Sequence, residues 1–94
     1  MKEPKFDKDG YPTAATLDAI SNWPLEDVGG LWQFIIKAWK YKDYFRIKGH
    51  LLHLSTGGWS GNEDIISAMM RNTLVWYMCW KSSRKGGHHV FKIK

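Results

Sequence analysis

Apolar residues recur at helical intervals in the N-terminal half of the chain. The segment TAATLDAISNW shows this spacing, and Thr13 or Thr16 can cap the start of the helix that it predicts. Pro24 ends that helix and opens a second one over roughly residues 25–40, where Glu26 and Asp27 suit the positive end of the helix dipole. The apolar positions are Leu17 and Ile20 in the first helix and Val28, Leu31, Trp32, Ile35, Ile36 and Trp39 in the second.

The period of the pattern changes from helical to alternating near residue 44. Phe45 and Ile47 alternate with polar neighbours, and Leu52 and Leu54 continue the alternation beyond Gly49. Alternation of this kind is typical of a strand with one buried face, and an isolated glycine inside it is typical of a bulge. The sequence therefore predicts one strand over about 44–54 with a bulge at Gly49.

The glycine-rich stretch TGGWSGNE separates this strand from a third predicted helix. Ser60 and Glu63 match a capping box, in which each side chain bonds the backbone N–H of the other residue. The helix that they open carries Ile65, Ile66, Met69 and Met70 and ends near Asn72.

The last twenty residues are predicted to form a hairpin. TLVWYMCWK is β-branched and aromatic, and we interpret it as a strand buried on both faces. SSRKGG has the composition of a turn, and HHVFKIK alternates like a final strand. One uninterrupted helix from Glu63 through Trp80 is the alternative, because Met, Leu and Trp tolerate either conformation.

This order of elements predicts an α+β fold in a single compact domain over residues 13–94. A small, mostly antiparallel sheet of about three strands would pack with about three helices, and residues 1–12 would form a flexible leader. A chain of 94 residues fits one domain. Aromatic residues make up 15% of the chain, more than a small domain can bury alone, so we expect a homo-oligomer, in its simplest form a dimer.

Charge and cysteine content narrow the function classes. The net charge of +5 allows an anionic ligand or nucleic acid as partner, with clusters of cations over 37–48 and 81–94. Cys79 is the only cysteine, which rules out an intrachain disulfide and fits a reducing cytoplasm. No signal peptide or membrane-spanning segment is expected.

The glycine-rich stretch is the strongest candidate for a ligand site. It joins a strand to a helix N-terminus, where backbone N–H groups are free, and glycines let a ligand approach the backbone. The predicted ligand-binding residues are Thr56, Gly57, Gly58, Trp59, Ser60, Asn62 and Glu63, with Arg84 and His88 supplied by the facing hairpin. The alternative is a simple turn, in which Ser60 and Glu63 only cap the helix and Trp59 fills the core.

TGGWSGNEDII, together with the later SSR and GGHHVF, resembles a family of small proteins of tailed bacteriophages and prophages that carries a T-G-G-W-S-G-N-E motif. The resemblance covers roughly residues 13–93, and the chain departs from the pattern at Lys85 and His89. It implies a phage context, with the host cytoplasm as location, and no particular chemistry.

Three functions follow from these features, and none is enzymatic. The first is capture of a small polar ligand, with sequestration of a nucleotide-derived immune signal as its specific form. The others are inhibition of a host enzyme through a protein–protein contact, with exposed tryptophans as anchors, and nucleic-acid binding through the basic clusters. No cofactor or metal is predicted. A metal site would require His50 or His53 to meet His88 with a carboxylate such as Glu63, and exposed or hydrogen-bonded histidines are the favoured interpretation.

Overall fold

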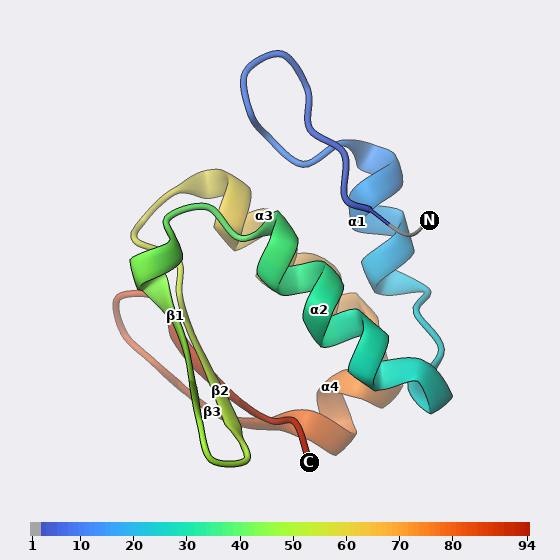
Figure 1. The fold of residues 1–94 in the computed structure, drawn as a ribbon, viewed down its shortest axis with the longest axis vertical. Helices are drawn as coiled ribbons and strands as arrows, with labels where there is room; N and C mark the ends of the chain where they lie inside the picture. The colour runs from blue at the N-terminus through green and yellow to red at the C-terminus, as the bar shows by residue number, and fades with distance from the viewer. Residues whose placement is uncertain (1–2) are drawn as a thin grey trace.

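Helices and sheet form two layers in the computed structural model, which describes residues 3–94 (Figure 1). The helices are α1 (Ala14–Ser21), α2 (Val28–Ala38), α3 (Ser60–Arg71) and α4 (Thr73–Cys79), with short 3-10 helices η1 (Leu25–Asp27) and η2 (Lys42–Tyr44). The strands are β1 (Phe45–Lys48), β2 (Leu51–Ser55), β3 (Trp80–Arg84) and β4 (His88–Lys92). The predicted α+β single domain is confirmed, with four strands in place of about three.

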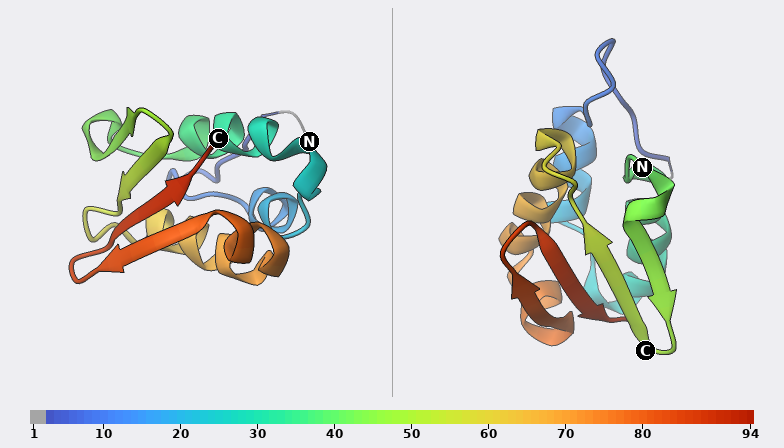
Figure 2. Two further views of the ribbon diagram at one scale, coloured as in Figure 1. Left: turned by 90° about the horizontal axis from the view of Figure 1, so that it is seen from below. Right: turned by 90° about the vertical axis from the view of Figure 1, so that its left-hand side faces the viewer.

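The sheet is antiparallel throughout, in the order β1-β2-β4-β3. Two hairpins, β1–β2 and β3–β4, join along β2 and β4, so the last strand of the chain lies in the middle of the sheet. The helices α3 and α4 connect the two hairpins. Viewed toward the sheet, no α-helix lies in front of the strands, so one face of the sheet is left open (Figure 2, right).

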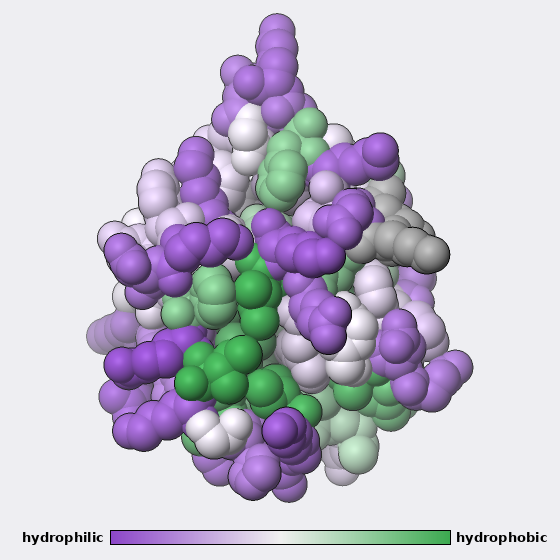
Figure 3. Space-filling model, in the orientation of Figure 1, coloured by the Kyte–Doolittle hydropathy of each residue, from purple (hydrophilic) through white to green (hydrophobic). Residues whose placement is uncertain are grey.

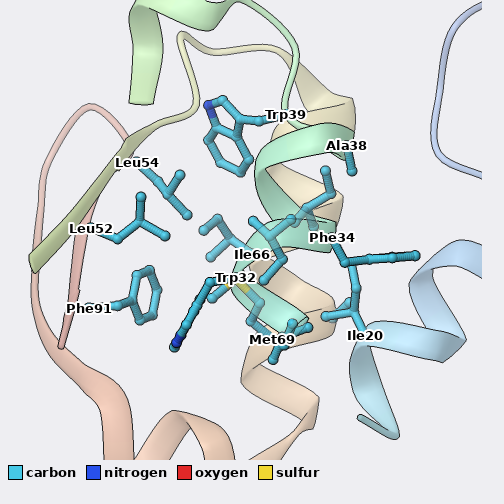
Figure 4. Close-up of a cluster of buried hydrophobic side chains, with 14 of the residues drawn as sticks. Ile20, Trp32, Phe34, Ala38, Trp39, Leu52, Leu54, Ile66, Met69 and Phe91 are labelled. Carbon is cyan, nitrogen blue, oxygen red and sulfur yellow. The ribbon is translucent and has the colours of Figure 1, made fainter. Parts of the chain in front are cut away.

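The core lies between the other face of the sheet and the helices. Leu52, Leu54 and Phe91 point from the strands toward Trp32 and Ile66 (Figure 4), and the three strand residues are fully buried. Burial of each such side chain contributes about 1.5–3 kcal/mol, so this layer contact is the main source of stability.

The first two helices agree with the sequence prediction. Thr13 Oγ1 accepts from the backbone N–H of Thr16 at 3.2 Å and caps α1, as expected. The predicted second helix over 25–40 begins as the 3-10 helix η1 and continues as α2 to Ala38.

The predicted strand over 44–54 is in fact a hairpin. Lys48 pairs with Leu51, so only Gly49 and His50 form the turn, and Gly49 alone has a positive φ, 60°. A positive φ at the first of two central residues is characteristic of a type II′ turn. The glycine therefore reverses the chain instead of forming a bulge.

The prediction of a strand over 73–81 is wrong for residues 73–79, which form α4. Asn72 ends α3 and its Oδ1 accepts from the N–H of Val75 at 3.4 Å, so it caps the next helix. Val75 and Cys79, four positions apart, are both buried, which is the spacing of a helix face. The strand begins only at Trp80, and it is an exposed edge strand rather than one buried on both faces. The rival of one continuous helix is also excluded by the break at Asn72.

The capping box predicted at the start of α3 is absent. Trp59 occupies the N-cap position and makes no side-chain cap bond, while Ser60 is already helical. The Ser60 hydroxyl instead bonds the Tyr11 hydroxyl at 3.3 Å.

The predicted leader contacts the domain from residue 3 onward, and residues 1 and 2 lie outside the described residues. Lys37 pairs with Glu3 at 2.8 Å, and the N–H of Lys5 donates to Thr16 Oγ1 at 2.8 Å. Within residues 3–94, no helix is both long enough and apolar enough to cross a bilayer.

The molecular surface in the orientation of Figure 1 is mostly polar, with a narrow apolar band where the β1–β2 hairpin meets α2 (Figure 3). A second group of exposed apolar side chains belongs to α4. Leu74, Tyr77 and Met78 on this helix have exposed fractions of 64%, 84% and 58%.

Candidate functional site

The open face of the sheet follows from strand alternation. Leu52, Leu54 and Phe91 point toward the helices, so their neighbours along each strand point the other way. Pairing across the strands then places three rows on the open face. These rows are Lys48, Leu51 and Lys92; Arg46, His53, Val90 and Ser82; and Ser55, His88 and Arg84.

Three polar side chains on β2 and β4, the two central strands, form a hydrogen-bonded group on this face. His53 Nδ1 lies 3.3 Å from His88 Nε2, and the Ser55 hydroxyl lies 2.8 Å from His88 Nδ1. Ser55 and His88 are direct partners in the β2–β4 register, which explains why their side chains meet. We call His53, Ser55 and His88 the His–Ser group.

Cations surround the His–Ser group, and no acidic residue lies on any strand. The four strands contain no aspartate or glutamate, and their cations are Arg46, Lys48, Lys81, Arg84 and Lys92. Arg46 pairs with His53 in the register, and Arg84 pairs with His88. Among residues 3–94, neither arginine side chain forms a hydrogen bond or an ion pair. Both are exposed, so two guanidinium groups are free to bind an anion.

The surroundings of His53 change its pKa. Loss of solvation lowers the pKa of His53 below its ordinary value, and the positive charges of His88, Arg46, Lys48 and Arg84 lower it further. A neutral imidazole at neutral pH follows, which keeps a ring nitrogen available to accept or transfer a proton.

A pocket of about 390 Å³ lies beside the His–Ser group. Its lining residues are Lys42, Asp43, Tyr44, Phe45, Arg46, His53, Ser55 and His88. The volume falls within the range of small-molecule sites, roughly 300–1,000 Å³. Asp43 on η2 is the only acidic residue in this lining, and the other polar groups are neutral or cationic.

Asn62, one of the residues predicted to bind a ligand, uses its side-chain amide for hydrogen bonds within the protein. Its Nδ2 donates to the carbonyl oxygens of Lys40 and Thr56, at 3.1 and 3.3 Å, and its Oδ1 accepts from the Lys40 N–H at 3.0 Å. The side chain is fully buried. In this structure Asn62 ties the end of α2 to the glycine-rich loop.

Trp59 packs under the N-terminal segment instead of facing a pocket. Its ring lies 5.0 Å from the ring of Tyr11 and 6.4 Å from that of Tyr41, and the Lys40 ammonium lies 4.6 Å from its centroid. These contacts are typical of aromatic packing with a cation–π partner.

Two of the three loop glycines make room for aromatic rings. A Cβ on Gly61 would overlap the Trp59 ring, and a Cβ on Gly57 would overlap the Tyr44 ring. Gly57 and Gly58 also have positive φ, 64° and 76°, and nothing lies above Gly58. Packing and chain reversal therefore account for these glycines without a ligand.

Thr56 and Glu63 contact each other through their side chains. The Thr56 hydroxyl donates to Glu63 Oε2 at 3.3 Å, and a Cβ on Gly87 would overlap the Thr56 hydroxyl. His89 lies on the face of the sheet that is turned toward the helices, since it pairs with Leu54. Its pKa is lowered by burial and by His88, and raised in part by Glu63.

The predicted site is thus split into separate groups. Arg84 and His88 do come together, but with Arg46, His53 and Ser55, not with Trp59 or Asn62. Arg46 and Ser55 are not among the predicted residues, because the hairpin that brings them together was predicted as one strand. A two-residue Gly-X turn between alternating segments was the available signal.

His53 and His88 do meet across the sheet, as a metal site would require, but Glu63 lies near His89, whose side chain is on the opposite face of the sheet. Residues 3–94 contain no group of three His, Cys, Asp or Glu side chains placed to hold a metal ion. The comparisons with known protein families, curated proteins and solved structures find no match to this chain.

Proposed function

We propose that this protein binds a small phosphorylated, nucleotide-like ligand on the open face of its sheet. The observation that carries the proposal is the pair of unpaired guanidinium groups, Arg46 and Arg84, on either side of the His–Ser group. Arginine presents its N–H groups in a planar fork that matches two phosphate oxygens at once. The pocket beside the group offers room for the rest of the ligand.

The phage resemblance gives this proposal its specific form. A small phage protein that captures a nucleotide-derived immune signal in the host cytoplasm would need a binding site and no chemistry. The open face provides cations, imidazole and hydroxyl groups for such a ligand.

A thermal-shift screen tests the proposal. Cyclic dinucleotides, cyclic ADP-ribose isomers and ordinary nucleotides would be added to the protein one at a time. A ligand at a hundred times its Kd stabilises the folded state by about 2.7 kcal/mol. We expect at least one such ligand to raise the melting temperature, and Arg84→Gln to abolish the rise. Lys85→Gln, which changes a cation in the adjacent turn, is the matched control.

Nucleic acid is the second candidate, favoured by the length of the cation array. Lys48 and Lys92 extend the positive charge along the strands from Arg46 and Arg84 toward the β1–β2 turn. A polymer that contacts several of these cations releases counterions, so its affinity falls steeply with salt. A mononucleotide that contacts one or two cations has a shallow salt dependence, and titrations at two salt concentrations separate the candidates.

A further inference from the structure

The two imidazoles of the His–Ser group face each other through one ring nitrogen each. The Ser55 hydroxyl holds Nδ1 of His88 at 2.8 Å, and this contact turns Nε2 of His88 toward Nδ1 of His53, 3.3 Å away. The ring centroids are 5.5 Å apart and the ring planes are tilted by 40°. A phosphate group that displaced this contact would lie between two imidazole nitrogens.

We propose that this pair of histidines cleaves RNA, with His53 and His88 as the two proton-transfer groups on opposite sides of a bound phosphodiester. The inference rests on the proposed function, since the phosphate must first bind between Arg46 and Arg84. It goes beyond ligand capture and departs from the sequence-based expectation of a protein without catalytic activity.

The reaction needs no co-reactant. His53 takes the proton of the ribose 2′-hydroxyl, and the 2′-oxygen attacks phosphorus, forming the 2′-O–P bond. The P–O5′ bond breaks, and the leaving 5′-oxygen takes a proton from His88. The products are a 2′,3′-cyclic phosphate and a free 5′-hydroxyl, and exchange with water returns each imidazole to its starting state. Attacking and leaving oxygens lie in line in phosphoryl transfer, so the two imidazoles, which are 3.3 Å apart without a ligand, separate to opposite sides of the phosphorus when the phosphodiester binds.

The surroundings favour the role of His53 as the base and the binding of the phosphate. Burial and the neighbouring cations lower the pKa of His53, which leaves its imidazole neutral and able to act as the base. The guanidinium groups of Arg46 and Arg84 are placed to stabilise the negative charge that grows on the phosphorane. The charged groups around the pair are Lys42 and Asp43 on η2, Arg46 and Lys48 on β1, and Arg84 on β3.

The test is cleavage of an RNA oligonucleotide labelled at both ends, in the presence of EDTA. We expect fragments that end in a 2′,3′-cyclic phosphate and a bell-shaped dependence of the rate on pH. His53→Ala and His88→Ala should each lower the rate by about 100-fold or more. His50→Ala, in the exposed β1–β2 turn, is the matched control and should keep the wild-type rate.

Two comparisons keep the test decisive. A 2′-O-methyl oligonucleotide of the same sequence cannot be cleaved but presents the same phosphates. If this oligonucleotide binds and the RNA stays intact, the cleavage proposal is wrong and the binding function stands. If neither RNA nor any nucleotide binds, both are wrong. Equal cleavage by wild-type protein and by both folded histidine variants would assign the activity to a contaminating nuclease and overturn the proposal.

Discussion

His53 Nδ1 and His88 Nε2 lie 3.3 Å apart on the open face of the sheet, with Arg46 beside the first imidazole and Arg84 beside the second. Neither guanidinium has a protein partner among residues 3–94. Together with burial, the positive charges of Arg46 and Arg84 help to lower the pKa of His53, and no strand residue supplies a carboxylate, so a bound anion would be stabilised on this face.

Burial of two imidazoles, together with nearby positive charge, predicts a pH dependence of stability. The pKa values of His53 and His89 are lowered in the folded protein, so the unfolded chain binds more protons in the window below the ordinary histidine value of about 6.5. The free energy of unfolding therefore falls as the pH falls through this window, and the contribution is fully present above it. Denaturant unfolding at several pH values should show this slope.

His53→Gln removes one of the titrating groups and should flatten the slope, while His50→Gln, in the exposed turn, should leave it unchanged. A His53→Gln variant with the full wild-type slope would contradict the assignment of the lowered pKa to His53.

Asn62 is predicted to stabilise the fold and not to contact the ligand. Asn62→Ala leaves the buried backbone groups of Lys40 and Thr56 without their partner, which costs at least about 2 kcal/mol. In a domain of this size the melting temperature should fall by roughly 8 °C or more. Asn22→Ala, which changes an exposed asparagine with a single bond to Asp18, is the control and should have a small effect.

The ligand test for Asn62 is separate from the stability test. At a temperature where Asn62→Ala is fully folded, its ligand affinity should equal that of the wild type. A large loss of affinity without a loss of stability would restore Asn62 to the binding site.

Gly57 and Gly61 of the loop should be intolerant of a methyl group for packing reasons. Gly61→Ala would push a Cβ into the Trp59 ring, and overpacking of this kind costs about 1–3 kcal/mol. Gly29→Ala, in the open on α2, should instead stabilise the protein by about 0.5–1 kcal/mol. Equal effects of the two substitutions in thermal unfolding would show that the ring over Gly61 is not in place in solution.

The apolar side of α4 is where we propose that a second copy of the chain docks. Apart from Thr73 the helix is apolar all round, and Leu74, Tyr77 and Met78 face solvent. Such helices are normally covered on both sides. Light scattering should give the mass of a dimer, and Tyr77→Glu should give that of one chain, with Lys85→Glu as control. A single-chain mass for the wild-type protein at high concentration would contradict this and leave the side for a different partner.

Local signals were enough to predict most of the fold. The Thr13 cap and the helical spacing of apolar residues in α2 were predicted and found, because both depend on contacts within one turn of the chain. Segment 73–79 was mispredicted because an apolar run has no polar residues to reveal its period. The cap at Asn72 and the pair Val75 and Cys79 carried the helical signal.

The site was harder to predict because it depends on sheet register. Reading Gly49 as a bulge kept β1 and β2 in one strand, and the facing of Arg46 and His53 could not be seen. Asn62 and Trp59 looked exposed because loops usually lie at the surface. Their partners, Lys40 and Tyr11, are distant in sequence, and no local pattern predicts such contacts.

The most direct test of the account is to map where a ligand binds, by following backbone amide NMR signals during titration with the nucleotide that gives the largest thermal shift. We expect the changes to gather on β2 and β4, at His53, Ser55 and His88, and to extend to Arg46 and Arg84. Changes centred on Gly57, Gly58 and Trp59, with β4 unaffected, would contradict it and return the site to the glycine-rich loop.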